Sequence, residues 1–202
     1  SITIDDQDNL ETITLAGKLG AITLSDNDNL TDITISADVD GAITIGVDTA
    51  GNAANNSDLV NVTLTGSKAT GVTVSNNAEL ESLTIDTTMQ AGTADDAVLD
   101  GSVVVKDNAA LTSLTISSSS LETLTITGND DLTTIDGTGI AAIGATGEPT
   151  VTIEDNDLTA TASVDAEDST ATADGAASTD LGSVTTESGM ETLKTYLALV
   201  AA

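Results

Sequence analysis

Closely spaced carboxylates are the residues of this chain that could do chemistry. The candidate ligands form five short groups: Asp26 and Asp28; Asp38 and Asp40; Asp130 and Asp131; Asp155 and Asp157; and Asp165, Glu167 and Asp168. Calcium binds about six to eight oxygen atoms, which Asp side chains and turn carbonyls supply, so it is the expected cofactor. None of the groups matches an EF-hand loop or the calcium-binding G-G-x-G-x-D solenoid repeat, and an ordinary solvated turn is the alternative at each one.

The residue types needed by most enzymes are missing. The chain has no His and no Cys, so it has no Ser-His or Cys-His nucleophile, no zinc site of the usual kind and no thiol redox motif. Paired carboxylates leave a carbohydrate-active β-helix as an alternative, because glycoside hydrolysis uses two such groups. Such proteins usually present aromatic platforms to sugar rings, and Tyr196 is the only aromatic residue here. We therefore expect no catalytic activity.

The charge balance restricts the partners. The chain carries 33 acidic residues against four Lys and Arg together, a net charge of −29. Phosphate binding needs Lys or Arg, so we expect no nucleic-acid partner. No run of about 18 apolar residues could cross a bilayer, which argues against direct membrane insertion. Divalent cations are the expected small partners, because so acidic a surface attracts them.

The elements that would position these carboxylates come from an internal repeat. Each copy has an apolar-x-apolar triplet, an Asn/Asp-rich corner, a leucine and a second triplet. The copies begin at Ile2, Ile22, Ile43, Val72, Val103, Leu124 and Val151. A repeat of about 20 residues is typical of a solenoid, whose stacked rungs bury a shared core. We predict an all-β fold, a parallel β-solenoid with rungs of about 20 residues and two short strands per rung.

Alternation within each triplet predicts which side chains form the core. The two apolar residues should point inward and the middle residue, usually Thr, outward. The leucines after the corner should form a second buried column, consisting of Leu10, Leu30, Leu59, Leu80, Leu111, Leu132 and Leu158. Asn and Asp tolerate left-handed backbone, so the corner should be a tight polar turn. The return corner, as at 17–20 or 65–71, is expected to be a separate link between two sheets.

Departures from the repeat define the domains. Residues 1–158 form the predicted solenoid, with loop insertions at 46–57 and 86–102. Residues 159–202 are predicted to be an acidic, extended Ala/Thr/Ser tract followed by a C-terminal helix. Ser188 and Glu191 provide a capping box for that helix.

Two surfaces are candidates for assembly. The strand containing Ile2 and Ile4 begins the array, and an uncovered strand edge recruits other strands. The predicted C-terminal helix offers Leu193, Tyr196 and Leu197 to a neighbouring subunit, with a plain cap on the last rung as the alternative. Because the two ends differ, their contact would be heterologous and would propagate into a lattice or fibre. A neighbour's residues 159–164 are a candidate for the added strand.

Outward threonines suggest a different function. Flat T-x-T arrays resemble those of ice-binding β-solenoids, so an ice-binding or adhesive module is an alternative. Most triplets here have a single central Thr, and the flanking positions vary among Asp, Ser, Ala and Asn. An exposed strand favours Thr for its shape alone.

The stretch from Leu111 to Asn129 resembles leucine-rich repeats and receptor-L-type β-helices through its L-x-x-L-x-[IL] pattern. This resemblance covers about residues 1–158, and a second triplet stands where ordinary leucine-rich repeats have a helix. With its acidity, its lack of Cys and its Thr/Asp/Ala richness, the whole chain resembles a bacterial surface-layer (S-layer) protein of the marine gammaproteobacterial type. That resemblance implies a secreted, calcium-stabilised lattice of identical copies at the cell surface or in biofilm matrix, without catalysis.

Overall fold

The described part of the chain is all-β, and its strands are nearly all parallel. The computed structural model describes residues 1–89, 101–118, 121, 123–140, 150–154, 156 and 182–184. Its strands are β1 (Ile2–Asp5), β2 (Thr12–Leu19), β3 (Ile22–Ser25), β4 (Asp32–Ile45), β5 (Asn61–Ser75), β6 (Ser82–Met89), β7 (Ser102–Lys106), β8 (Ser113–Ser118), β9 (Thr123–Thr127), β10 (Thr134–Ile140), β11 (Thr150–Glu154) and β12 (Gly182–Val184). These residues include no helix, and the all-β prediction is confirmed.

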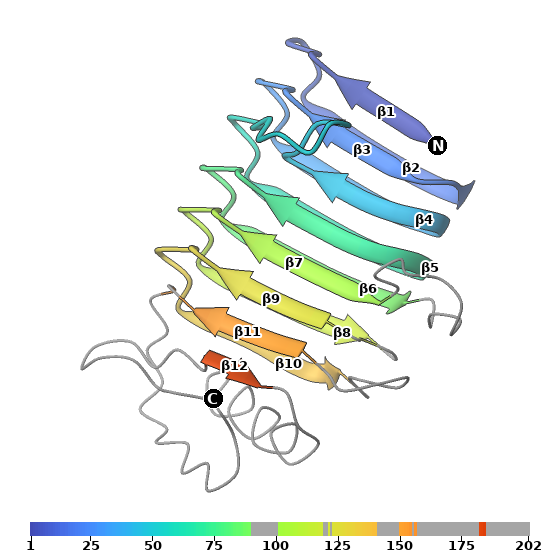
Figure 1. The fold of residues 1–202 in the computed structure, drawn as a ribbon. Coiled ribbons are helices and arrows are strands. Elements are labelled where there is room, and N and C mark those ends of the chain that lie inside the picture. The colour runs from blue at the N-terminus through green and yellow to red at the C-terminus, as the bar shows by residue number, and fades with distance from the viewer. Residues whose placement is uncertain are drawn as a thin grey trace, which may run out of the picture.

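The strands form one curled sheet (Figure 1). One row runs β1-β3-β4-β5-β7-β9-β11, and β2, β6, β8 and β10 build a second row through β4 and β5. The two rows are joined because β4 and β5 continue through the return corner. The expectation of two separate sheets with two short strands in every rung is therefore wrong for these rungs. Small residues such as Ala37 and Gly66 let the backbone bend there without leaving the ladder.

The pairing register follows the sequence repeat. On one face, Ile2 pairs with Ile22, Ile22 with Ile43 and Ile43 with Val72. Each strand thus lies beside its copy in the next repeat, and we call one such repeat a rung, the first rung being residues 1–20. A slip of one residue would turn every apolar side chain outward, so core burial fixes this register. The arrangement is compatible with a β-solenoid.

A continuous aliphatic core fills the space inside the curled sheet. Fully buried leucines follow the corner in the interior rungs, at Leu30, Leu59, Leu80, Leu111 and Leu132. Their burial confirms the predicted leucine column. Leu10 in the first rung is only partly buried, and Leu158 lies outside the described residues.

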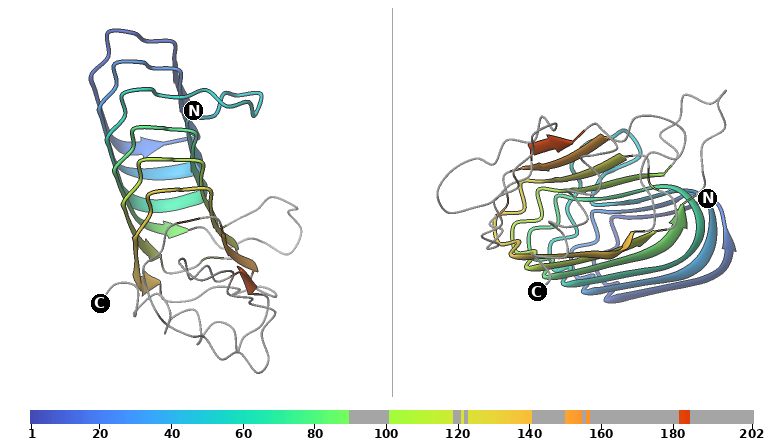
Figure 2. Two further views of the ribbon diagram at one scale, coloured as in Figure 1. Left: turned by 90° about the vertical axis from the view of Figure 1, so that its left-hand side faces the viewer. Right: turned by 90° about the horizontal axis from the view of Figure 1, so that it is seen from below.

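Both predicted insertions are shorter than expected. Residues 46–55 leave the stack as a protruding loop (Figure 2, left), closed by an antiparallel bridge between Val47 and Ala53. Asn56, assigned to this loop from sequence, is instead buried in its rung. The second insertion was predicted at 86–102, but residues 86–89 belong to β6 and Ser102 belongs to β7. Residues 90–100 lie outside the described part.

The C-terminal segment is described only at β12. This strand lies antiparallel on β11, pairing Val151 with Val184 and Ile153 with Gly182. The predicted helix, its capping box and the candidate strand at 159–164 all lie outside the described residues.

Candidate assembly surface

The Asn/Asp corner is built the same way in five of the rungs. Asp6, Asp26, Asn76, Asp107 and Gly128 have left-handed backbone, with φ between 54° and 65°. Asn, Asp and Gly adopt this conformation more readily than other residues, so the predicted turn chemistry is confirmed. The backbone carbonyl of the residue after each of them accepts the N–H of the next leucine, and in the interior rungs the side chain of that residue points toward the inside of the stack.

The inward residue is an asparagine, and these asparagines form a continuous hydrogen-bonded ladder. Its members are Asn27, Asn56, Asn77, Asn108, Asn129 and Asn156, all of them buried. Beyond Asn27, each Oδ1 accepts the side-chain Nδ2–H of the asparagine one rung earlier, at 3.0–3.2 Å. It also accepts that residue's backbone N–H. Buried amides are costly unless satisfied, so the ladder links every corner to its neighbours.

Carbonyl groups complete the environment of the ladder. The Nδ2 atom of Asn108 also donates to Val74 O at 3.0 Å, and that of Asn129 to Val105 O at 3.2 Å. The sequence predicts only a tight polar turn for these asparagines, and their role in the ladder was missed. Their regular spacing could have revealed this role, because an asparagine stands five residues after the start of the first triplet in five of the repeats. The 46–55 loop hides the sixth, Asn56.

The ladder ends at the first rung because Gln7 takes the asparagine position. Its backbone N–H donates to Asn27 Oδ1 at 3.2 Å. Its side-chain Nε2 turns back to Asp5 O at 2.8 Å and Asp6 O at 3.0 Å. Because the backbone N–H of Gln7 donates to Asn27 Oδ1, the first acceptor of the ladder is already used within the chain. The exposed side chain of Gln7 does not extend the ladder.

The first rung also forms an open end. Among the described strands, β1 pairs only with β3 and β2 only with β4, so each has one free edge. Ile2 is half-buried, and so are Ile4, Leu10, Leu15 and Leu19, which pack against the core from one side. Their counterparts one rung on, Leu24, Leu30, Ile35 and Val39, are at most 1 % exposed. The open end therefore combines unpaired backbone edges with uncovered aliphatic side chains.

Four of the predicted calcium ligands lie near this end without forming a metal site. Asp26 and Asp28 are exposed, and Asp28 Oδ1 lies 3.1 Å from the Ser57 hydroxyl that donates to it. Asp38 pairs with Lys68 Nζ at 3.3 Å, and Asp40 is exposed at the return corner.

The remaining predicted ligands lie farther along the chain. Asp130 and Asp131 are exposed on a corner turn of the sixth rung. No group of three or more carboxylates able to hold a metal occurs in the part of the chain that the structure describes. Asp155, Asp157, Asp165, Glu167 and Asp168 lie outside that part, as do Leu193, Tyr196 and Leu197.

The outward threonines are stacked in register. Thr14 lies beside Thr34, Thr34 beside Thr63 and Thr63 beside Thr84 on one face. The opposite face carries a similar column that Val104 interrupts. The positions that flank these threonines vary in residue type. Along one edge of the first threonine column, for example, Asp32, Asn61 and Ser82 follow one another.

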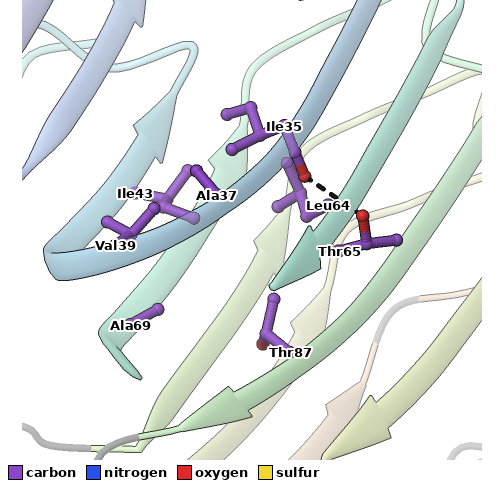
Figure 3. Close-up of a pocket in the computed structure, with 8 residues that line it drawn as sticks. All are labelled: Ile35, Ala37, Val39, Ile43, Leu64, Thr65, Ala69 and Thr87. Atoms are coloured by element: carbon purple, nitrogen blue, oxygen red, sulfur yellow. Dashed lines mark hydrogen bonds between the residues drawn. The ribbon is translucent and has the colours of Figure 1, made fainter. Parts of the chain in front are cut away.

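The return corner contains a small apolar space (Figure 3). It is lined by Ile35, Ala37, Val39, Ile43, Leu64, Thr65, Ala69 and Thr87. The space is too narrow to admit a water molecule. It is a packing feature of the bend and offers no ligand site.

No described helix is long and apolar enough to cross a membrane. Comparison of the chain with protein-family models, curated proteins and solved structures finds no match.

Proposed function

We propose that this chain is a β-solenoid that assembles with further copies of itself into an extracellular lattice or fibre, as a surface layer or part of a biofilm matrix. The observation that carries the proposal is the open end. Unpaired strand edges recruit further strands, and soluble proteins normally protect them with charge, bulges or a covering segment. Here both outer edges of the first rung have no partner among the described strands, and they border half-buried aliphatic residues.

Calcium is proposed as the ion that makes close packing of copies feasible. Each copy carries a net charge of −29, so copies brought together repel one another unless cations gather between them. Asp6, Asp8, Asp26 and Asp28 are exposed on the corners nearest the open end. Carboxylates of two copies together could supply the oxygen ligands that the described part of a single copy does not bring together.

The assembly proposal is tested by imaging the protein in negative stain with and without calcium. Ordered arrays are expected with the unmodified chain and none with Ile2→Lys/Ile4→Lys, which places charge on the open end. Ala78→Lys/Ala109→Lys is the matched control, because it adds the same charge at exposed corners of interior rungs. Arrays that persist in the first variant, or that vanish equally in both, contradict a role for the open end.

The calcium proposal has a separate test. Removal of calcium with a chelator at constant ionic strength should dissolve the arrays. If sodium at matched ionic strength restores them fully, charge screening explains the effect and a specific calcium site does not.

The registered threonine columns favour one second candidate, an ice-binding or adhesive surface. Thr14, Thr34, Thr63 and Thr84 present hydroxyl groups at the strand spacing of about 4.8 Å. The variable flanking residues weaken this candidate. Thermal hysteresis of the monomeric Ile2→Lys/Ile4→Lys variant tests it, and a value equal to that of buffer rules it out.

A further inference from the structure

The two ends of the stack differ in a way that selects how copies meet. At the last described rung, β12 occupies the outer edge of β11 by antiparallel pairing, with Thr152 opposite Ser183. A parallel β1 from another copy could not use that edge while β12 is in place. At the first rung, the outer edges of β1 and β2 are both unpaired within the part of the chain that the structure describes.

Charge also opposes head-to-tail stacking. Asp5 and Glu154 each follow directly after the same register column, which runs from Ile4 of β1 through Leu24, Ile45, Val74, Val105 and Ile126 to Ile153 of β11. A copy stacked in register on β11 would place Asp5 directly opposite Glu154. Like charges directly opposite each other destabilise a strand pair.

The asparagine ladder gives a third reason. Continuation into another copy would need an asparagine at position 7, whose Oδ1 would accept from the last asparagine of the neighbour. Gln7 instead bonds Asp5 O and Asp6 O with its side chain. The ladder is terminated at this end and does not present an acceptor there.

We propose that the partner of the open end is the open end of a second copy, related by a two-fold axis. Antiparallel pairing of β1 with its copy, centred on Thr3, places Ile2 opposite Ile4 of the second copy, with both side chains facing inward. This inference rests on the proposed function in one respect, since it takes the open end as the contact surface.

The backbone edge fits this pairing. Ile2 N donates to Ala21 O at 2.8 Å, toward the second rung. Alternate residues of a strand direct their N–H and C=O to opposite sides, so those of Thr3 lie on the free edge. Two copies can therefore exchange a pair of hydrogen bonds at Thr3. Antiparallel pairing on an outer edge is the mode that β12 already uses at the other end.

The charges fit as well. Antiparallel pairing sets the acidic corner of one copy, with Asp6, Asp8 and Glu11, beside the return corner of the other. Lys18 lies exposed at that return corner, near the end of β2. Lys18 thus faces the acidic corner at both ends of the paired strands, whereas Asp40, exposed at the same return corner, belongs to the second rung and lies farther from the contact. Because a two-fold contact closes on itself, a lattice needs at least one further contact elsewhere.

A single introduced thiol tests the geometry, because the chain has no cysteine. Directly paired residues in antiparallel strands have Cα atoms about 5.5 Å apart, within reach of a disulfide. Full-length chain with Thr3→Cys should therefore form a covalent dimer on mild oxidation, at twice the 20.0 kDa mass of one chain. Thr44→Cys, on the same face of an interior rung, is the control and should stay monomeric.

Sedimentation of further variants distinguishes the contribution of the backbone N–H on the edge of β1 from that of the Thr3 side chain. Thr3→Pro removes the free N–H and should abolish the dimer, since an edge strand tolerates proline where its N–H faces solvent. Thr3→Ala keeps that N–H and should leave the dimer intact. Lys18→Glu should weaken the dimer, whereas Lys106→Glu in an interior rung should not.

The outcomes distinguish this inference from the proposed function. Absence of a cross-link with Thr3→Cys overturns the two-fold contact, whether the chain remains monomeric or assembles through another segment such as 159–164. Ordered arrays without the cross-link leave the self-assembly proposal standing. A cross-linked dimer that never forms arrays supports the two-fold contact and overturns the lattice.

Discussion

The first rung and the interior rungs share one sequence pattern but differ in burial. Ile22 and Leu24 of β3 are fully buried, whereas Ile2 and Ile4, their register partners in β1, are half-buried. The corner residue differs too, since Asn27 joins the ladder and Gln7 ends it. A rung therefore gains its core from its neighbours, as expected where stability is a sum of nearest-neighbour interfaces.

The largest effect should come from breaking the ladder in an interior rung. Asn108→Ala removes the acceptor of Asn77 N and Asn77 Nδ2 and leaves Val74 O without its side-chain donor. Each buried group left unsatisfied costs about 1–3 kcal/mol, so we expect a loss of about 3–6 kcal/mol in unfolding free energy.

Chemical denaturation measures that loss, with Gln7→Ala as the control in the first rung. Gln7 is exposed, and its side chain bonds only nearby carbonyls, so its removal should cost less than about 1 kcal/mol. Equal losses of unfolding free energy in the two variants would show that the ladder does not stabilise the interior rungs more than the first rung.

A smaller difference is expected in the leucine column. Leu80→Ala should cost about 2–5 kcal/mol, because it opens a cavity in a fully buried position. Leu10→Ala should cost clearly less, since Leu10 is covered from one side only. Denaturant midpoints of the two variants provide the comparison, and a larger loss for Leu10→Ala would mean that the open end is covered in solution.

The smallest effect concerns the 46–55 loop, which is bonded to the stack at Gly46 and Ala54 and protrudes between them. The Asn52 side-chain amide, at 2.9 Å from Asp48 Oδ2, lowers the pKa of that carboxyl from its ordinary 3.8, and backbone N–H groups of Asn52 and Ala50 add to the effect. A lowered pKa stabilises the folded loop above 3.8, and that contribution is lost as the pH falls through the folded value.

An NMR titration of the Asp48 carboxyl measures this shift. Asn52→Ala should move the pKa of Asp48 back toward 3.8 without changing the global unfolding free energy, because the loop is exposed and separate from the core. A global loss of stability in this variant would show that the loop supports the rungs.

Much of the fold follows from the sequence because its period is regular. The triplets at Ile22 and Ile33 predict parallel strands with inward apolar pairs, and the structure places both strands in that register. The lack of His and Cys excludes His- or Cys-dependent catalysis on the evidence of the sequence alone. The spacing did not reveal that β4 and β5 would continue through the return corner, because small residues such as Ala37 suit a turn and a bent strand equally.

The repeat, the leucine column and the acidic surface can be predicted from the amino-acid sequence, because burial of apolar residues at a fixed period permits only one register. Which polar residues are buried depends instead on how the rungs stack in three dimensions. Asp26 and Asn27 are adjacent and both suit a turn, yet Asp26 is exposed and Asn27 is buried. The left-handed backbone of Asp26 turns the next side chain inward, where an amide can both donate and accept between rungs. A carboxylate at this position could only accept hydrogen bonds, and the carboxylates of successive rungs would repel one another. This position therefore takes asparagine.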